Sequence, residues 1–394
     1  MTSPPFRFHW SPTDTFHSSM ASSTLLPLIL VFLHGLRGGD GCFTAIFSFG
    51  DSIADTGNLL ISEHGNIQSA RPPYGQTFFN RPTGRYSDGR LIIDFIAEAL
   101  GFSFMPPFLE GPGDGGFRRG VNFAVAGATA LDVHFYRERG MDVIRTNLSL
   151  QTQFGWFKEL LPSICSTDSD CRNLLATSLV LAGEIGGNDF AYAFGQGKSL
   201  SELKSYVPIV NHAIGVLIND LIELGAKTLL VPGNFPIGCL PIYLIMFEHS
   251  EDHDLSTGCI KWLNDFAQYQ NKHLQLELDR LRALHPYATI IYADYYNPIM
   301  NIISNQNKNS TGKVTLAACC GGGGPYNFGN RVQCGDASAS VCDDPSLYIS
   351  WDGVHLTEAA YRFIAEGLLE GPFADPPIKE VCYKRSPDHK VDDA

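Results

Sequence analysis

The sequence predicts an α/β fold, a sandwich in which a parallel β-sheet lies between two layers of helices. One observation is a series of short apolar, β-branched or aromatic runs of strand length, at residues 43–49, 121–126, 178–185, 227–233 and 288–294. The other is that segments with apolar residues three and four positions apart, a helical spacing, lie between these runs. Strands that alternate with helices form parallel sheets that are buried on both faces.

The helical segments follow the strand runs in order, at residues 91–100, 151–161, 209–225 and 262–285. A last one, 357–369, begins after Thr357, whose hydroxyl is well suited to cap a helix N-terminus. Before this helix, residues 296–350 have little periodicity, contain four cysteines and are rich in Gly, Asn and Ser. We expect this stretch to form a long loop region held by disulfide bonds.

The domain organisation follows from length and composition. By length alone, 394 residues would allow two or three domains, yet α/β enzymes of this size are often one domain. No internal repeat is visible, and no Pro/Ser/Gly-rich or charged linker divides the middle of the chain. The sequence therefore predicts a leader over residues 1–41, a single domain over 42–382 and a polar tail over 383–394.

The leader has the features of a signal peptide for export. Residues 25–36 form an apolar run that is shorter than the roughly 20 residues of a membrane span, and small residues before Cys42 allow cleavage there. We therefore expect no membrane span. The segment 1–19 is long and polar, whereas Met20 begins an ordinary signal sequence. Met20 is the expected translation start, with the first nineteen residues an extension; a disordered leader is the alternative.

Export to an oxidising compartment would explain the ten cysteines. Their number is even, and cleavage before Cys42 would remove none of them. We expect them to form disulfides, with Cys165 and Cys171 as a local pair. A zinc site is the rival interpretation, but no C-x-x-C spacing occurs. Asn147 and Asn309 stand in N-x-S/T sequences and are candidate glycosylation sites in an exported chain.

The net charge of −13 bears on the class of partner. Nucleic-acid binding needs a basic surface, so it is not expected. An acidic surface keeps a protein soluble and mildly favours a cationic substrate. The sequence predicts no oligomeric state.

Chemistry-bearing groups follow the first three strand runs. In parallel sheets, ligands bind beyond the carboxyl ends of the strands. Ser52 follows the first run within "GDS", Gly127 follows the second and Asn188 follows the third within "GGND". A nucleophile and donors for a developing oxyanion, including the N–H of Ser52, would thus meet at one edge, as acyl transfer requires. The simpler alternative is that Gly127 and "GGND" only form turns.

A serine nucleophile also needs a base, usually a histidine that a carboxylate orients. His355 lies three residues after Asp352 in "WDGVHLT", so the two side chains can touch in a turn. His249 and His253 are four residues apart and resemble a helical metal pair, but their neighbours offer no further ligands, and a solvated acidic loop is favoured. No metal and no cofactor are expected.

Three competing motifs fail. No G-x-S-x-G is present, so the nucleophile elbow of the α/β-hydrolases is missing. The "GPGDGG" of residues 111–116 matches a dinucleotide-binding pattern, but it follows no strand and opens no helix. Asp51 and Asp55 lack the alternating acidic positions and terminal Glu of a calcium loop, so we assign them to shaping the turn.

Four blocks in this order, "FSFGDSIADTGN", "VNFAVAGATA", "IGGNDF" and "WDGVHLT", resemble the GDSL esterase/lipase family, also called SGNH hydrolases. Further blocks at 71–101, 231–241 and 319–329 are similar to its plant branch, and there to the group of sinapine, acetylajmalan and acetylcholinesterase-like esterases. The likeness covers nearly the whole of residues 42–382. One departure is Ile53, where the name-giving motif has Leu.

The resemblance implies a single-domain sandwich with a five-stranded, flavodoxin-like sheet. It implies that the nucleophile is Ser52, that the catalytic Asp and His are Asp352 and His355, and that the oxyanion donors are Ser52, Gly127 and Asn188. The expected protein is a secreted serine esterase of the apoplast, with the vacuole as the alternative location. It would hydrolyse small or medium esters of specialised metabolites through an acyl-enzyme. An acyltransferase, a lipase for longer acyl chains and an inactive binding protein are the alternatives.

Substrate choice should depend on the loops around the strand ends, at residues 64–82, 131–147 and 241–256. Four aromatic side chains would add cation–π contacts to a cationic ester, although ordinary core packing is the favoured interpretation of each. The aromatic residues considered are Trp156, Phe190, Tyr192 and Tyr243.

Overall fold

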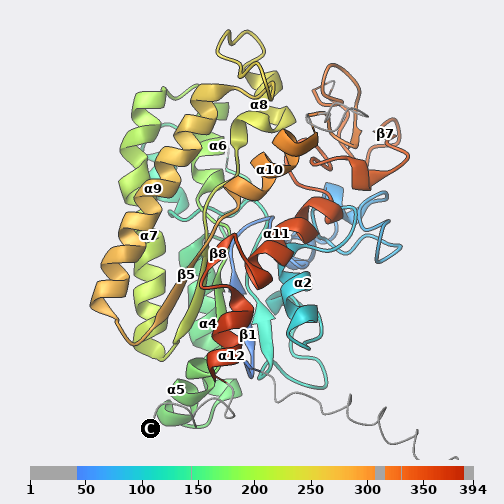
Figure 1. Ribbon diagram of the computed structural model, residues 1–394. Helices are drawn as coiled ribbons and strands as arrows, with labels where there is room; N and C mark the ends of the chain where they lie inside the picture. The colour runs from blue at the N-terminus through green and yellow to red at the C-terminus, as the bar shows by residue number, and fades with distance from the viewer. Residues whose placement is uncertain (1–41, 143, 307–315, 330, 386–394) are drawn as a thin grey trace, which may run out of the picture. The chain divides into compact units, whose positions relative to one another are not determined.

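The computed structural model describes residues 42–142, 144–306, 316–329 and 331–385. Its centre is a sheet with the strand order β2-β1-β3-β4-β5-β8 (Figure 1). The first five strands are parallel and β8 is antiparallel; their bounds are β1 Ile46–Phe49, β2 Gly120–Asn122, β3 Leu179–Ala182, β4 Thr228–Pro232, β5 Thr289–Ala293 and β8 Ala374–Asp375. The predicted α/β sandwich with a parallel, flavodoxin-like sheet is confirmed, and β8 is an edge strand that the sequence did not predict.

Helices cover both faces of this sheet. Helices α4 (Leu150–Ile164), α7 (Leu200–Leu224) and α9 (Lys261–Leu284) lie on one face, at the left in Figure 1, and α2 (Ile92–Ala99) and α11 (Glu358–Glu370) pack together on the other. Because both faces are covered, strands such as β1 and β3 are apolar and buried along their whole length. The remaining helices are α1 Asn58–Ser62, α3 Val133–Arg137, α5 Asp168–Ala176, α6 Gly187–Gly195, α8 Pro241–Met246, α10 Tyr296–Gln306 and α12 Ile378–Arg385.

Helix α7 starts earlier than the predicted segment 209–225. Its N-terminus is a capping box in which the Ser199 hydroxyl accepts the Glu202 N–H and the Glu202 carboxylate accepts the Ser199 N–H. Pro208 lies inside the helix and disguises this first part in the sequence, because proline usually ends a helix. By length and composition α7 is also apolar enough to cross a membrane, but half of its most apolar window is buried against the protein, as in a core helix.

Five disulfide bonds pair all ten cysteines. The predicted local pair Cys165–Cys171 forms, and no cysteine remains for zinc. Two bonds hold the loop region before α11, where β6 (Cys320–Gly321) pairs with β7 (Ser340–Val341). The bonds are Cys42–Cys382, Cys165–Cys171, Cys239–Cys259, Cys319–Cys342 and Cys320–Cys334.

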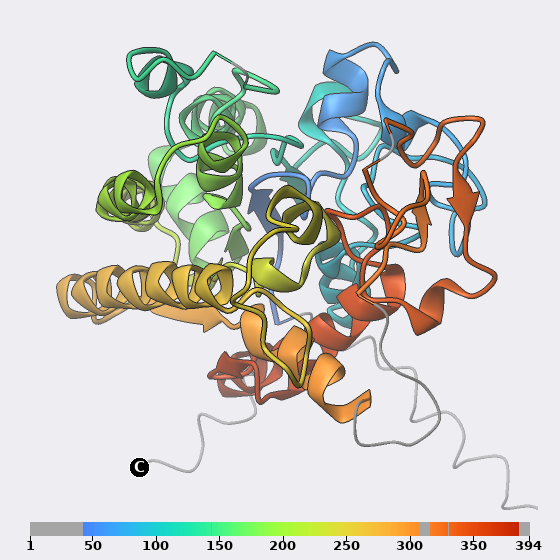
Figure 2. The ribbon, with the colours of Figure 1, turned by 90° about the horizontal axis from the view of Figure 1, so that it is seen from above.

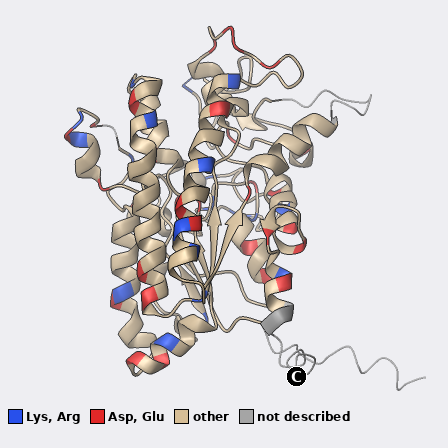
Figure 3. Cartoon of the chain, turned by 60° about the vertical axis from the view of Figure 1, so that its left-hand side comes forward, with Lys and Arg blue, Asp and Glu red and all other residues tan. Residues whose placement is uncertain are grey.

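The carboxyl edge of the sheet carries the long loops. Helices α6, α8 and α10 begin just beyond β3, β4 and β5, and Figure 2 looks down onto this edge. Figure 3 shows basic and acidic residues interspersed along the outer helices. The loop after α8 is acidic, with Glu248, Glu251, Asp252 and Asp254. The edge that receives a ligand in parallel sheets is thus the one with the most elaborate loops.

Candidate active site

The turn after β1 presents Ser52 at the carboxyl edge of the sheet. Gly50 ends the strand with a φ of +137°, and a Cβ there would come within 2.8 Å of the Glu184 carbonyl oxygen. Asp51 Oδ1 then accepts the Ile53 N–H at 3.0 Å. The carboxylate of Asp55 accepts the N–H groups that open α1, including those of Gly57, Asn58 and Leu59. Asp51 and Asp55 thus shape the turn, as expected.

Ser52, His355 and Asp352 form a hydrogen-bonded series. His355 Nε2 lies 2.8 Å from Ser52 Oγ, and His355 Nδ1 lies 2.7 Å from Asp352 Oδ2. The main chain of the turn supports this arrangement, since the His355 N–H donates to Asp352 Oδ1 at 2.8 Å. Ser52 is 9% exposed and His355 is 8% exposed, so the series is nearly closed off from bulk solvent. The structure therefore brings together the three residues that the sequence predicted from widely separated positions.

Asp352 stays ionised at neutral pH in this setting. Burial acts to raise its pKa, but the attraction of His355 and hydrogen bonds from His355 and Tyr74 outweigh burial and lower the pKa to about 2. A carboxylate in this position fixes the orientation of the imidazole and stabilises its protonated form. The geometry suits a histidine that acts as a general base toward Ser52 and then as a general acid toward the leaving group.

Two tyrosines complete the surroundings of His355. The Tyr74 hydroxyl donates to Asp352 Oδ2 at 2.8 Å, and the Tyr86 ring packs on the imidazole with 4.5 Å between ring centroids. Neither residue was predicted from the sequence. The one available signal is their place in the block 71–101, which is similar to the plant branch of the family.

The predicted oxyanion donors gather beside Ser52. Gly127 adopts a φ of +82°, and a Cβ there would come within 2.7 Å of the Arg145 side chain. Asn188 stands in the first turn of α6 and its Nδ2 donates to Asp51 Oδ2 at 2.9 Å and to the Ala128 carbonyl at 3.0 Å. The carboxamide is therefore held between the Ser52 turn and the Gly127 loop. Both N–H donors of the carboxamide are engaged, so one of these two hydrogen bonds must break before Asn188 can donate to a substrate oxygen.

The Gly127 loop is further tied to α6 by buried polar contacts. Asp189 accepts the N–H groups of Ala130 and Leu131 and the hydroxyl of Tyr136. Burial raises the pKa of Asp189 to about 7, although these hydrogen bonds act to lower it. The Tyr192 hydroxyl donates to the Gly127 carbonyl at 2.9 Å. The "GGND" segment therefore does more than form a turn, because it fixes the loop that carries Gly127.

A cavity of about 200 Å³ opens beside His355. Its wall is largely apolar and comes from three stretches of chain around residues 68–86, 321–334 and 352–355, together with one α8 residue. Of the three loops predicted to affect substrate choice, 64–82 contributes to this wall, 241–256 contributes only Ile242 of α8, and 131–147 contributes none of the described lining residues. The disulfide-held stretch 321–334 was not expected here. The main side chains of the wall are Tyr74, Tyr86, Ile242, Phe328, Val332 and Val354.

The aromatic residues considered for cation–π contacts are not part of this wall. Phe190 and Tyr243 are buried in the core, and the Trp156 ring stacks on another aromatic side chain. Tyr192 lies at the Gly127 carbonyl. Core packing, the favoured interpretation, fits the buried Phe190 and Tyr243, and none of the four side chains contributes to this wall.

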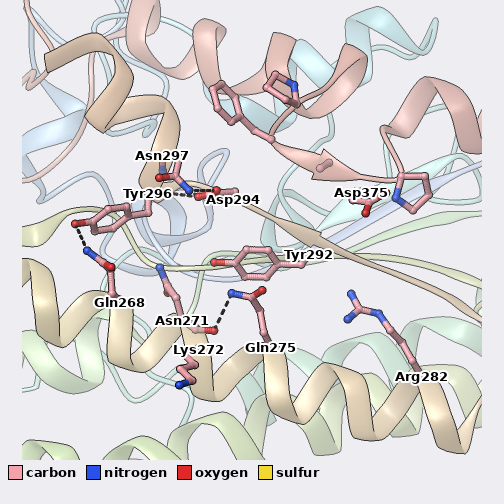
Figure 4. A pocket seen from close by; sticks show the side chains of 14 residues that line it. Gln268, Asn271, Lys272, Gln275, Arg282, Tyr292, Asp294, Tyr296, Asn297 and Asp375 are labelled. Carbon is pink, nitrogen blue, oxygen red and sulfur yellow. Dashed lines mark hydrogen bonds between the residues drawn. The ribbon is translucent and has the colours of Figure 1, made fainter. Parts of the chain in front are cut away.

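A larger cavity of about 680 Å³ lies elsewhere, between α9, β5 and residues 372–376 (Figure 4). Several of its polar side chains are already satisfied within the protein. Gln268 donates to the Tyr296 hydroxyl, and Arg282 donates to the Ile290 carbonyl. It contains no histidine or serine. The smaller cavity beside His355 is therefore the candidate active site.

The remaining predictions concern a metal site, two glycosylation sites and the leader. Within the described residues, no group of three His, Cys, Asp or Glu side chains could hold a metal ion. His249 is exposed, and His253 Nδ1 lies 3.0 Å from the Gly258 carbonyl in the acidic loop. Asn147 is exposed just before α4. Asn309 and the leader 1–41 lie outside the described residues.

Comparison with known proteins identifies the family. A family model described as GDSL-like lipase/acylhydrolase matches residues 46–368. Two GDSL esterase/lipases of Arabidopsis thaliana are each 53% identical over 344 residues, or 86% of this chain and 85% and 88% of theirs. A catalytic mutant of an acetylxylan esterase from Geobacillus stearothermophilus is 13% identical, and the match covers 85% of this chain and 97% of that chain with a TM-score of 0.39. The chain belongs to the GDSL-like lipase/acylhydrolase family and is an ester-hydrolysing serine hydrolase of the plant GDSL esterase/lipase type.

Proposed function

We propose that this protein is a secreted serine esterase that cleaves carboxylic esters through an acyl-enzyme on Ser52. The observation that carries the proposal is the series of short hydrogen bonds from Ser52 Oγ through His355 to Asp352. A serine hydroxyl is a weak nucleophile until such a base takes its proton. Membership of an esterase family supports the same chemistry.

The proposed reaction runs in two halves. His355 takes the Ser52 proton as Oγ attacks the ester carbonyl, and Asp352 stabilises the imidazolium. The main-chain N–H groups of Ser52 and Gly127 and the carboxamide of Asn188 stabilise the oxyanion. His355 then protonates the leaving alcohol, and a water that it activates releases the acid from Ser52.

The proposed substrates are small or medium esters of specialised metabolites. The cavity of about 200 Å³ is small for an ester-binding pocket and suits a short acyl or small aromatic group better than a long chain. Among the residues that the structure describes, those of the wall include no Lys or Arg, so they offer no cationic partner for an anionic substrate. The resemblance to sinapine and alkaloid esterases points to the same substrate class by analogy.

The proposed location is the oxidising space outside the cell, with the vacuole as the alternative. Five disulfides that pair every cysteine support this, because reducing compartments keep thiols free. We further propose that residues 1–41 are removed, that 42–382 is one domain and that Asn147 carries a glycan. N-terminal sequencing and mass spectrometry of the protein from plant tissue test all three.

The decisive experiment compares the wild type with Ser52→Ala. The variant should lose hydrolysis of p-nitrophenyl acetate by several orders of magnitude and should not react with a fluorophosphonate probe, while its thermal unfolding stays close to that of the wild type. Retained esterase activity would refute Ser52 as the nucleophile. Wild-type labelling without hydrolysis, together with ester formation when an alcohol is added, would instead indicate an acyltransferase.

A further inference from the structure

A fully buried glutamine of α4 binds the main chain just before the nucleophile. Gln153 has no exposed surface, and its side chain contacts Gly50, which lies between β1 and Ser52. Gln153 Oε1 accepts the Gly50 N–H at 2.9 Å, and Gln153 Nε2 donates to the Gly50 carbonyl at 2.8 Å. Facing residues of antiparallel strands exchange the same two bonds, so the amide acts on Gly50 as a neighbouring strand would.

The packing of α4 on β1 explains why this side chain reaches Gly50. One turn further along α4, the Phe157 ring packs edge-on against Phe47 and Phe49 of β1, with 5.4 and 5.6 Å between ring centroids. Residues four apart lie on the same face of a helix, so Gln153 lies over the end of the strand. The other buried residues of α4 are apolar, and the buried amide avoids a large desolvation cost because Gly50 binds both of its ends.

The Gly50 carbonyl also joins the two segments that carry the main-chain oxyanion donors. It accepts the Val125 N–H at 3.1 Å in addition to Gln153 Nε2, and Val125 lies two residues before Gly127. On the other side of this junction, Ser52 lies two residues after Gly50. The direction of the Gly50 carbonyl therefore affects how the N–H groups of Ser52 and Gly127 lie relative to each other.

We propose that Gln153 is a positioning residue for acyl transfer, which holds the Gly50 peptide and thereby places the hydroxyl and N–H of Ser52. This deepens the proposed esterase function and rests on it. The Ser52 hydroxyl then faces His355, and its N–H converges with that of Gly127 on the oxyanion. Glycine has the widest backbone freedom of all residues, so the direction of the Gly50 peptide must be fixed by contacts from outside.

Removal of both bonds tests the proposal. Gln153→Met keeps the length of the side chain but has no amide, and kcat for p-nitrophenyl acetate should fall about 10²-fold with little change in KM, the scale for misplacing a reacting group by about 1 Å. A trifluoromethyl ketone, which forms a tetrahedral adduct with a reactive serine, should bind more weakly by a similar factor.

A second variant keeps the test decisive if Gln153→Met does not fold. Gln153→Glu has the same length and keeps an acceptor for the Gly50 N–H, but it sets a carboxylate oxygen against the Gly50 carbonyl where an N–H donates in the wild type. Its kcat should fall at least as far as that of Gln153→Met.

The chain offers a matched control at another strand end. Asn271 of α9 makes the same pair of bonds beyond β4, where it accepts the Asn234 N–H at 2.7 Å and donates to the Asn234 carbonyl at 2.9 Å. It is also buried, and the segment that it binds carries no proposed catalytic group. Asn271→Leu should therefore lower the thermal stability as Gln153→Met does, but leave kcat and ketone binding unchanged.

The outcomes separate positioning from a merely structural role. A lower kcat and weaker ketone binding in the Gln153 variants alone would support the inference. An unchanged kcat in a folded Gln153 variant, a loss confined to KM, or an equal loss of kcat in Asn271→Leu would each overturn it. The esterase proposal fails only if Ser52→Ala stays active, so the two failures are distinguishable.

Discussion

Tyr74 and His355 bind the same oxygen of Asp352. The Tyr74 hydroxyl donates to Asp352 Oδ2 at 2.8 Å, and His355 Nδ1 lies 2.7 Å from that atom. A carboxylate held from two sides cannot rotate away from the imidazole, and its negative charge is stabilised by both contacts. Tyr74 therefore supports the orientation of His355 from the connection between α1 and α2.

Tyr74→Phe should lower kcat/KM by about tenfold, because one hydrogen bond to a charged group is lost while the ring remains. The pKa of Asp352 should rise in this variant. Steady-state kinetics with p-nitrophenyl acetate measure the effect. Tyr86→Phe is the matched control, since its ring still packs on His355, and an equal loss in both variants would contradict the role given to Tyr74.

Asp352 should also contribute to stability in a pH-dependent way. Its pKa is about 2 in the folded protein and about 3.9 in an unfolded chain, so it stabilises the fold above pH 4 by about 2–3 kcal/mol, and this is lost as the pH falls toward 2. Urea unfolding of the wild type and Asp352→Asn at a series of pH values tests this. The stability difference between them should shrink with acidification; a constant difference would argue against it.

Asn188→Ala should reduce kcat roughly 10²–10³-fold, the scale for removing one oxyanion donor. Both N–H bonds of the carboxamide are engaged in the structure, so the loss must appear when the transition state forms rather than in substrate affinity. A change confined to KM would instead make Asn188 a substrate-binding residue.

Phe328→Ala should shift the preference toward longer acyl chains. The ring lines the cavity and packs over Gly353, next to the turn that carries His355. Its removal should raise the ratio of kcat/KM for p-nitrophenyl octanoate to that for the acetate by about tenfold. Leu347→Ala removes an exposed apolar side chain of the same loop region and should leave the ratio unchanged. An unchanged ratio in Phe328→Ala would place the acyl group elsewhere.

The bond between Cys42 and Cys382 should be the most stabilising of the disulfides. It spans 340 residues, whereas Cys165–Cys171 spans 6. Loop-closure entropy then predicts that Cys42→Ser/Cys382→Ser costs about 3.5 kcal/mol more than Cys165→Ser/Cys171→Ser. Thermal or urea unfolding of the two double variants tests this ranking, and equal losses would contradict it.

The sequence predicted which candidate site residues lie at strand ends, because the strand runs and the loops that follow them can be read from local patterns. Ser52, Gly127 and Asn188 each follow an apolar run, and the carboxyl ends of parallel strands share one edge. Asp352 and His355 could be predicted as a pair because a three-residue spacing brings two side chains together within a turn. The start of α7 was not predicted because Pro208 interrupts the helical pattern, and β8 was not predicted because two residues are too few to show a strand pattern.

The walls of the pocket were not predictable in the same way. Tyr74 and Phe328 lie in loops without periodicity and reach Asp352 and Gly353 only through long-range packing. The hydrogen bond from the Asp51 N–H to the Glu184 carbonyl likewise joins two loops far apart in sequence. Patterns of apolar spacing describe which elements form, but not which loop side chains meet above the sheet.

The Cys42–Cys382 bond also fixes where a fusion partner or a solid support can be joined to the domain, relative to the active site. It holds the two ends of the predicted domain 4.9 Å apart between Cα atoms. Cys42 stands just before β1, at the end of that strand opposite to Ser52, and α12 ends near the same place (Figure 1). A tag, matrix or partner protein joined at either end of the domain would therefore lie opposite the carboxyl edge of the sheet. The cavity beside His355 would stay accessible to ester substrates.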